Sequence, residues 1–183
     1  MTFYSQNSVH EGMVFEIEKS LSGIAHNLIS IYNVLDAGDF SQKDDRVYKG
    51  ETEITSDYRV LDDIKNDTGA DVTVFVGDER CLTTLVDKKG NRLVGSHLDK
   101  EVASQVIEDG EEYFSQNVDV MGVRYFGYYV PIRNDENEVV GVSFAGESAE
   151  SVNTSMRFMT QGNVTISYTH LRAHETSQDL VCR

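Results

Sequence analysis

The stretch DVTVFVGDERCLTTLVDKKGNRLVGSHLD, residues 71–99, decides the fold, because it alternates short apolar runs with turn-forming residues. Three runs rich in Val, Leu and Thr predict β-strands: 71–76, 80–86 and 91–95. The sequence KKGN at 88–91 predicts a hairpin turn between the last two runs. The second run carries Arg80 beside Cys81 and two threonines, where a core strand would be apolar throughout. A buried cation needs a partner for its charge, so this run raises the question of a binding site.

The charge of the chain is strongly acidic. Its 183 residues include 16 Lys and Arg against 31 Asp and Glu, which gives a formal net charge of -15. Such an acidic surface argues against nucleic-acid binding and against binding to anionic lipid through a polybasic segment. The length suits one domain with a sizeable core.

A long helix is predicted at the start of the chain, from about Ser8 to Ala37. Its apolar residues are spaced alternately four and three apart, as in an a/d stripe: Ile17, Leu21, Ile24, Leu28, Ile31 and Leu35. Two interpretations stay open. The helix is either an ordinary amphipathic core helix, or one that also pairs with its twin in a homodimer.

The remaining segments predict an α+β fold. Residues 37–51 are polar and turn-rich, which favours a loop with at most one short helical turn. Residues 54–69 predict a helix capped by Thr55 or Ser56 and stopped by Gly69, and residues 98–114 a helix that ends at Gly110. Further strands are expected at Val118–Val120, Val123–Ile132 and Val139–Ala145. This order indicates an antiparallel sheet of about five strands, with the long N-terminal helix packed on it and the helices on one side.

The last seventeen residues, SYTHLRAHETSQDLVCR at 167–183, show no apolar periodicity. They resemble the translated read-through of a sequencing-library adapter, and such a segment carries no information about the fold. Without them Cys81 loses Cys182 as a disulfide partner, and the His-x-x-x-His pair of His170 and His174 is no metal site. We therefore expect no metal, no cofactor and a natural chain that is a fragment.

Several sequence elements occur in a characteristic order: VTVF, GDER and TT, then GNRLVGS, GEEYFSQNVDV with GVRYFGYYVPI, and VVGVSFAG. Together they resemble a single Cache domain, the PAS-like extracytoplasmic sensor module of bacterial methyl-accepting chemotaxis receptors. The resemblance covers about residues 10–155. It departs from the usual pattern at Cys81 and Leu82, where aliphatic residues or alanine are commoner, and at Ser96, where threonine is usual.

The resemblance implies a ligand-sensing domain that lies outside the cytoplasm in a membrane-anchored chemoreceptor and is not an enzyme. It divides the chain into an N-terminal helix after a missing first membrane span, a ligand-binding core, a segment leading to a missing second span, and a non-native tail: 1–40, 41–150, 151–166 and 167–183. The same domain also occurs on histidine kinases and cyclic-dinucleotide enzymes, and a ligand-free dimerisation module is a further alternative.

The resemblance also implies a pocket on one face of the sheet for a small metabolite, a carboxylate or an amino acid. Arg80 would bind a carboxylate through two parallel hydrogen bonds, unless it pairs with a surface carboxylate such as Asp78 or Glu79. Thr84 shares the face of Arg80 if no bulge intervenes, and Thr83 is the alternative. Additional candidates offer rings or hydroxyls: Tyr113, Tyr125, Tyr129, Phe75 and Ser143.

Two further residues, His97 and Cys81, are of types that can carry out catalysis. His97 follows a strand, where a capping or surface role is expected. Cys81 as nucleophile with His97 as base would make an enzyme, but a cysteine embedded in a strand lacks the surroundings that activate a thiol.

Overall fold

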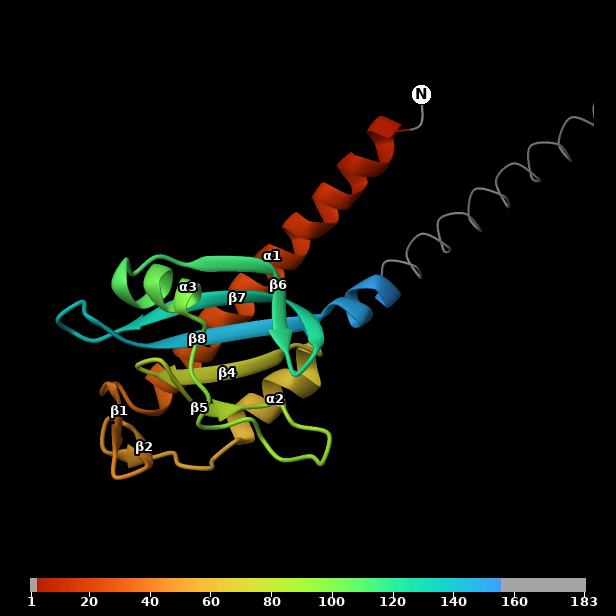
Figure 1. Cartoon of the computed structure of the whole chain (residues 1–183). Helices are drawn as coiled ribbons and strands as arrows, with labels where there is room; N and C mark the ends of the chain where they lie inside the picture. The colour runs from red at the N-terminus through yellow and green to blue at the C-terminus, as the bar shows by residue number, and fades with distance from the viewer. Residues whose placement is uncertain (1–2, 156–183) are drawn as a thin grey trace, which may run out of the picture. The chain divides into compact units, whose positions relative to one another are not determined.

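The computed structural model describes residues 3–155 (Figure 1). The chain divides into two compact units, Met1–Glu147 and Ser148–Arg183. The elements in chain order are α1 (Phe3–Leu35), β1 (Phe40–Lys43), β2 (Arg46–Lys49), β3 (Thr52–Glu53), α2 (Arg59–Thr68), β4 (Asp71–Val76), β5 (Glu79–Thr83), α3 (Lys100–Ala103), the π-helical η1 (Ser104–Glu108), β6 (Tyr113–Val120), β7 (Val123–Arg133) and β8 (Val139–Ser148). In the second unit, residues 149–155 are helical.

The first unit is built on a five-stranded sheet in the order β5-β4-β8-β7-β6. The pairs β4–β5, β4–β8 and β6–β7 are all antiparallel. The predicted α+β fold, with a long N-terminal helix on an antiparallel sheet of about five strands, is confirmed. The central strand β8 is buried along most of its length, as its run of small and apolar residues indicates.

Helices cover both faces of this sheet, not one as expected. On one face, the Ser143 hydroxyl of β8 donates a hydrogen bond of 2.8 Å to the backbone oxygen of Ala25 in α1, and α1 passes behind the strands in Figure 1. On the other face, Val102 of α3 and Val106 of η1 join Phe75 and other sheet residues in one hydrophobic cluster. The sheet therefore has a core on each side.

The buried residues of α1 coincide with the predicted stripe at only two positions, Leu21 and Leu28. Leu21, Ala25, Leu28 and Tyr32 are buried, whereas Leu35 is 59% exposed. Ile17, Ile24 and Ile31 are half-buried. The spacing predicts the helix correctly, but Tyr32 takes the core position because its ring packs edge-to-face on Phe40, 5.3 Å away.

The segment predicted as a loop at 37–51 forms two strands of a second sheet, which β3 completes in the order β1-β2-β3. Asp44 and Asp45 have φ of 49° and 61°, so they make a two-residue hairpin turn of the kind in which both residues are left-handed. The prediction was wrong because these strands have two to four residues and carry several charges, which hides any apolar alternation.

The predicted third strand at 91–95 is also absent from the described sheet. Gly95 has φ of 77°, which breaks an extended run, and only one isolated bridge joins Val86 to Arg92. Segment 92–98 instead covers the outer edge of β5, where the Arg80 amide donates to the Ser96 oxygen at 2.7 Å and the Gly95 amide to the Arg80 oxygen at 2.8 Å. It protects an edge that would otherwise be open to other strands.

The two short helices follow the prediction in position but not in detail. α2 ends at Gly69, whose φ of 79° makes the expected left-handed cap. Its N-cap residue is Tyr58, which makes no side-chain cap hydrogen bond, so neither Thr55 nor Ser56 caps the helix. The Thr55 hydroxyl instead accepts a hydrogen bond from the Val47 amide at 2.9 Å. Of the helix expected at 98–110, the second half is the π-helical η1.

No helix within residues 3–155 is long and apolar enough to cross a membrane. The predictions for the tail at 167–183, with Cys182, His170 and His174, lie outside the described residues, as does most of the segment 151–166.

Candidate ligand-binding site

A β-bulge in β5 sets the direction of Arg80. Thr83 pairs with Thr73 and Leu82 with Val74, but Phe75 then pairs with Arg80, so Cys81 is the extra residue of the bulge. Because paired residues point to the same face, Arg80 shares its face with Phe75 and not with Leu82. The face of Phe75 is the one away from α1. The bulge therefore turns the cation of β5 toward the space under the segment that follows.

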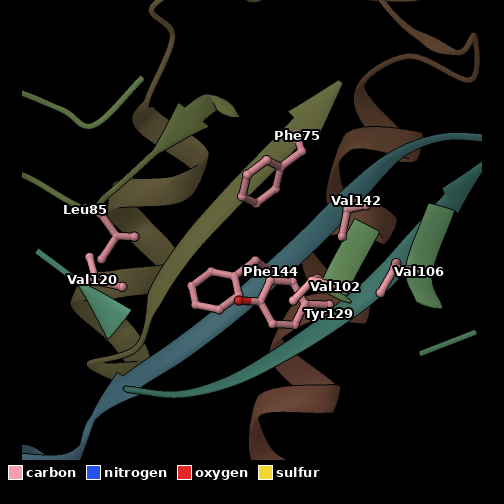
Figure 2. Packing of buried hydrophobic residues seen from close by; sticks show 8 residues of the cluster. All are labelled: Phe75, Leu85, Val102, Val106, Val120, Tyr129, Val142 and Phe144. Atoms are coloured by element: carbon pink, nitrogen blue, oxygen red, sulfur yellow. The ribbon is translucent and has the colours of Figure 1, made fainter. Parts of the chain in front are cut away.

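A cavity of about 270 Å³ lies on this face of the sheet. All five strands and the segment after residue 92 contribute to its wall. The lining residues are Phe75, Arg80, Leu93, Val94, Ser96, His97, Leu98, Asp99, Val118, Asp119, Val120, Met121, Tyr129 and Phe144. Figure 2 shows the rings of Phe75, Tyr129 and Phe144 on the same side of the strands, beside Val102 and Val106.

The guanidinium of Arg80 has few partners in the described chain. Its Nη1 donates a long hydrogen bond of 3.4 Å to the Leu93 oxygen, and its Nε is buried with no hydrogen-bond partner. It lies 5.3 Å from the centre of the Phe75 ring, a cation–π contact. The alternative, an ion pair with Asp78 or Glu79, is not formed among the described residues; Asp78 instead binds His97 at 3.2 Å. Burial lowers the pKa of Arg80, although a guanidinium stays charged at any physiological pH.

Tyr129 supplies a second polar group to the cavity. Its side chain is only 5% exposed, and its ring packs against Phe144 at 4.9 Å between centroids. Within residues 3–155 its hydroxyl makes no hydrogen bond, and the hydroxyl oxygen is not completely enclosed by protein atoms. Burial raises the pKa of Tyr129, so the phenol is a neutral donor. A buried hydroxyl normally finds a partner, and here the cavity is where one would bind.

A glycine makes room for the ring beneath the cavity. Gly127 lies between Tyr125 and Tyr129 on β7, and a Cβ there would come within 2.6 Å of the Phe144 ring and 2.9 Å of Val118. The ring of Phe144 can therefore rest on the β7 backbone only because residue 127 is glycine.

Segment 92–98 is fixed in place by Arg92. Its Nη2 donates to both carboxylate oxygens of Asp62 in α2, at 2.9 and 2.7 Å, and its Nη1 donates to the Thr83 oxygen at 2.7 Å. The guanidinium also lies over the Tyr58 ring, 4.0 Å from its centre. Arg92 thus ties the outer wall of the cavity to α2.

Phe75, Arg80 and Tyr129 are the predicted ligand-binding residues that line this cavity, and their role in binding stays a prediction. Thr83 and Thr84 have other hydrogen-bond partners. Thr83 shares the face of Arg80, because the bulge inverts the expected alternation, but its hydroxyl lies 2.7 Å from that of Thr73. The Thr84 hydroxyl donates to Asp71 at 2.7 Å and accepts from the Val72 amide at 2.9 Å.

The remaining predicted residues lie around the cavity rather than in its wall. Ser143 faces α1. The Tyr113 ring packs 6.1 Å from that of Tyr129. The Tyr125 hydroxyl donates to the buried carboxylate of Asp71 at 3.3 Å, and Lys65 binds the same carboxylate at 2.5 Å. Burial and the neighbouring Asp71 raise the pKa of Tyr125 to about 12.

Asp99 and Phe144 were missed by the sequence reasoning, and His97 was expected at the surface. His97 is exposed, but it also lines the cavity. A usable signal existed only for Phe144, which alternates with Val142 along β8 and shares the face of Phe75. Asp99 is brought to the cavity by the path of segment 92–98, which no local pattern encodes.

The enzyme alternative has no support in the geometry. The Cys81 thiol contacts the Gln42 side chain at 3.6 Å and the Glu79 oxygen at 3.4 Å, not His97. Burial raises the pKa of the Cys81 thiol, which disfavours the nucleophilic thiolate. Across residues 3–155, no three His, Cys, Asp or Glu side chains are grouped to hold a metal ion.

Comparison with known proteins gives one family and one fold. A family model described as "Single cache domain 3" matches residues 52–159. The crystal structure of the sensor domain of E. coli DcuS superposes with a TM-score of 0.57 at 12% sequence identity, covering 79% of this chain and 98% of that one. No curated protein sequence matches the chain.

Proposed function

Because the chain belongs to the single Cache domain 3 family, we propose that it is the extracytoplasmic ligand-sensing domain of a membrane-anchored receptor. Its ligand is a small metabolite that bears a carboxylate, either a simple carboxylate or an amino acid. It binds in the cavity between the sheet and segment 92–98. The likeness to the DcuS sensor domain supports the fold of such a module.

The observation that carries this proposal is the unpaired guanidinium of Arg80. A half-buried cation without an ion-pair partner is costly in the ligand-free protein, and it faces a cavity with room for a guest. A carboxylate would accept two parallel hydrogen bonds from this guanidinium. The Tyr129 hydroxyl would donate a further hydrogen bond, and the rings of Phe75 and Phe144 would contact apolar atoms of the guest.

The size of the cavity limits the ligand and its affinity. At about 270 Å³ it lies near the lower end of small-molecule pockets, which span roughly 300–1,000 Å³. A guest of about ten heavy atoms, at somewhat under ~1 kcal/mol per atom, would bind with roughly micromolar affinity. Such an affinity suits a sensor that must release its ligand.

Signalling would follow from a change in the position of α1. The ligand shifts the domain toward the arrangement that it binds more tightly, by no more than the difference in affinity. The Ser143 hydrogen bond to Ala25 connects the sheet under the cavity directly to α1. We infer a chemoreceptor as the whole protein, with a histidine kinase or a cyclic-dinucleotide enzyme as the alternative output.

A homodimer through α1 belongs to the same proposal. Ile17, Ile24 and Ile31 lie seven residues apart and stay half-buried, and Phe15 is 61% exposed. Such a seam would bury its apolar side chains against a second copy. Sedimentation of the wild-type chain and of an Ile24→Asp variant tests the dimer, which the substitution is expected to dissociate. A ligand-free dimerisation module is less favoured, because its sheet face would be filled rather than hollowed.

The test of ligand sensing is a thermal-shift screen of the full chain with small carboxylates and amino acids. At least one compound should raise the melting temperature in a concentration-dependent way. Arg80→Ala should abolish that shift, while Arg46→Ala, at an exposed arginine of β2, should leave it intact. Undiminished binding in Arg80→Ala would remove Arg80 from the site, and a screen without any stabilising compound would refute direct sensing.

A further inference from the structure

Asp99 is a second unpaired charge at the cavity. It lines the wall and is exposed at the start of α3, in the N-cap position. An aspartate there usually accepts a hydrogen bond from the first turn of its helix, but the Asp99 carboxylate makes no such bond. It also has no hydrogen bond or ion pair elsewhere in the part of the chain that the structure describes. Its oxygens are free to bind a guest.

Arg80 and Asp99 face the same cavity with opposite charges but do not form an ion pair with each other. Their charges still act at a distance. Burial lowers the pKa of Arg80, and the negative charge of Asp99 opposes that shift. Burial raises the pKa of Tyr129, and the charge of Asp99 raises it further. The cavity therefore holds a cation and an anion that are separated from each other, and neither has an ion-pair partner among the described residues.

The other charged groups of the wall do not add a second binding cation. Asp119 is a carboxylate whose Oδ1 accepts from the Gly122 amide at 3.2 Å. His97 directs its Nδ1 to the Asp78 carboxylate at 3.2 Å, so this nitrogen already has a partner outside the cavity wall. A guest with two carboxylates would find one cation, Arg80, and be repelled by Asp99 and Asp119.

We propose that the cavity selects a zwitterion, a small amino acid whose carboxylate binds Arg80 and whose ammonium group binds Asp99. This inference rests on the proposed ligand-sensing function and narrows its ligand class. Both an attraction and a repulsion at Asp99 discriminate the amino acid from other ligands. The ammonium gains a charge-assisted hydrogen bond to Asp99, and a dicarboxylate of the same size meets a carboxylate in its place. The rings of Phe75 and Phe144 contact the side chain of the amino acid.

The experiment compares matched compounds by calorimetric titration of the full chain. The probes are amino acids, each with the acid that lacks the amino group: alanine with propionate, 2-aminobutyrate with butyrate, leucine with 4-methylvalerate. Succinate and malate represent dicarboxylates. We expect at least one amino acid to bind about ten-fold to a hundred-fold more tightly than its matched acid and than either dicarboxylate. Raised salt should reduce this preference, because Asp99 is exposed.

Two variants test whether Asp99 causes the preference for an amino acid. Asp99→Asn keeps a good N-cap residue and removes only the charge, so it should fold normally and reduce the preference to less than about three-fold, which is near the error of such comparisons. Asp119→Asn removes an equal charge from the same wall and should keep most of the preference. Equal losses in the two variants would contradict the assignment to Asp99.

The outcomes separate this inference from the function on which it rests. If carboxylates bind and Arg80→Ala abolishes their binding, but the amino group adds no affinity or succinate binds best, the zwitterion inference is wrong and the sensing function stands. A preference that survives Asp99→Asn likewise overturns it. If none of the probes, including the complete set of standard amino acids, binds to the wild-type chain, both proposals fail.

Discussion

The hydroxyls of Thr73 and Thr83 lie 2.7 Å apart across the β4–β5 pair, two residues before the point where Phe75 pairs with Arg80. Both threonines are fully buried. Their contact fixes the register on one side of the bulge at Cys81, and the Phe75–Arg80 pair continues it on the other. The direction of the cation at the cavity thus depends on a hydrogen bond between neutral side chains within the sheet.

This pair of threonines predicts a measurable coupling. Thr83→Val leaves the Thr73 hydroxyl and the Leu85 amide, 3.1 Å from the Thr83 hydroxyl, without a partner. We expect the free energy of unfolding to fall by about 1–3 kcal/mol. In Thr73→Val/Thr83→Val the loss should be smaller than the sum of the two single losses, by roughly 0.5–1.5 kcal/mol. Urea denaturation of the four proteins measures this, and strict additivity would show that the two hydroxyls do not interact.

Arg80 is expected to destabilise the ligand-free domain, which gives a second prediction. Arg80→Met keeps a long side chain on the Phe75 ring and removes a half-buried charge with a buried, unpaired Nε. We expect a gain of about 0.5–1 kcal/mol, or roughly 1–4 °C in melting temperature, together with loss of ligand-induced stabilisation. Arg46→Met, at an exposed pair with Glu53, should change stability by less than about 0.5 kcal/mol. A less stable Arg80→Met would mean that the guanidinium is well satisfied without ligand.

The parts of this molecule differ in how well the sequence predicts them. The strands around Phe75, Tyr129 and Phe144 are predictable, because long apolar runs and period-two alternation persist whatever packs on them. The bulge is not, because Cys81 is as good a strand residue as its neighbours and a single extra residue leaves no mark on composition. That one residue exchanges the faces expected for Thr83 and Thr84.

The path of segment 92–98 is the other feature beyond local patterns. Its Leu and Val residues resemble a strand, and only the left-handed backbone at Gly95 prevents one. The anchor of Arg92 on Asp62 joins residues thirty positions apart, so nothing in the neighbourhood of either residue indicates it. Arg80 could be identified because charge within an apolar run is conspicuous, whereas Asp99, in a polar turn, resembles any surface carboxylate.

Arg92 supports a third prediction, which concerns the mobility of the cavity wall. Arg92→Ala removes the bidentate bond to Asp62 and the bond to the Thr83 oxygen. The Gly95 and Leu98 amides, which donate to β5 and to Asp78, should then exchange with deuterium about ten-fold faster or more. In Arg92→Lys the exchange rates should lie between those of the wild type and of Arg92→Ala, since an ammonium group cannot reproduce the planar arrangement of donors of a guanidinium. Lys88→Ala, at an exposed turn residue, is the control, and unchanged exchange in Arg92→Ala would show that β5 alone holds the segment.

The tyrosines predict a loss of stability at high pH. Burial raises the pKa of Tyr125 to about 12, and Asp71 adds to the shift; burial also raises the pKa of Tyr32 and Tyr129. In the unfolded chain a tyrosine ionises near pH 10, so above that pH the unfolded state releases protons that the folded state keeps. The tyrosines should therefore have no effect on the pH dependence of stability below about pH 9.5, and stability should fall steadily as the pH rises from there toward about 12.

Tyr125→Phe isolates one part of this slope. It removes a group that ionises near pH 10 in the unfolded chain but only at about 12 in the folded domain, so the variant should lose less stability than the wild type between pH 10 and about 12. At neutral pH it should be less stable by about 1 kcal/mol, because Asp71 loses one of its three side-chain partners. Urea midpoints at several pH values measure both effects. Parallel pH profiles for the two proteins would mean that Tyr125 ionises as readily in the folded domain as in the unfolded chain.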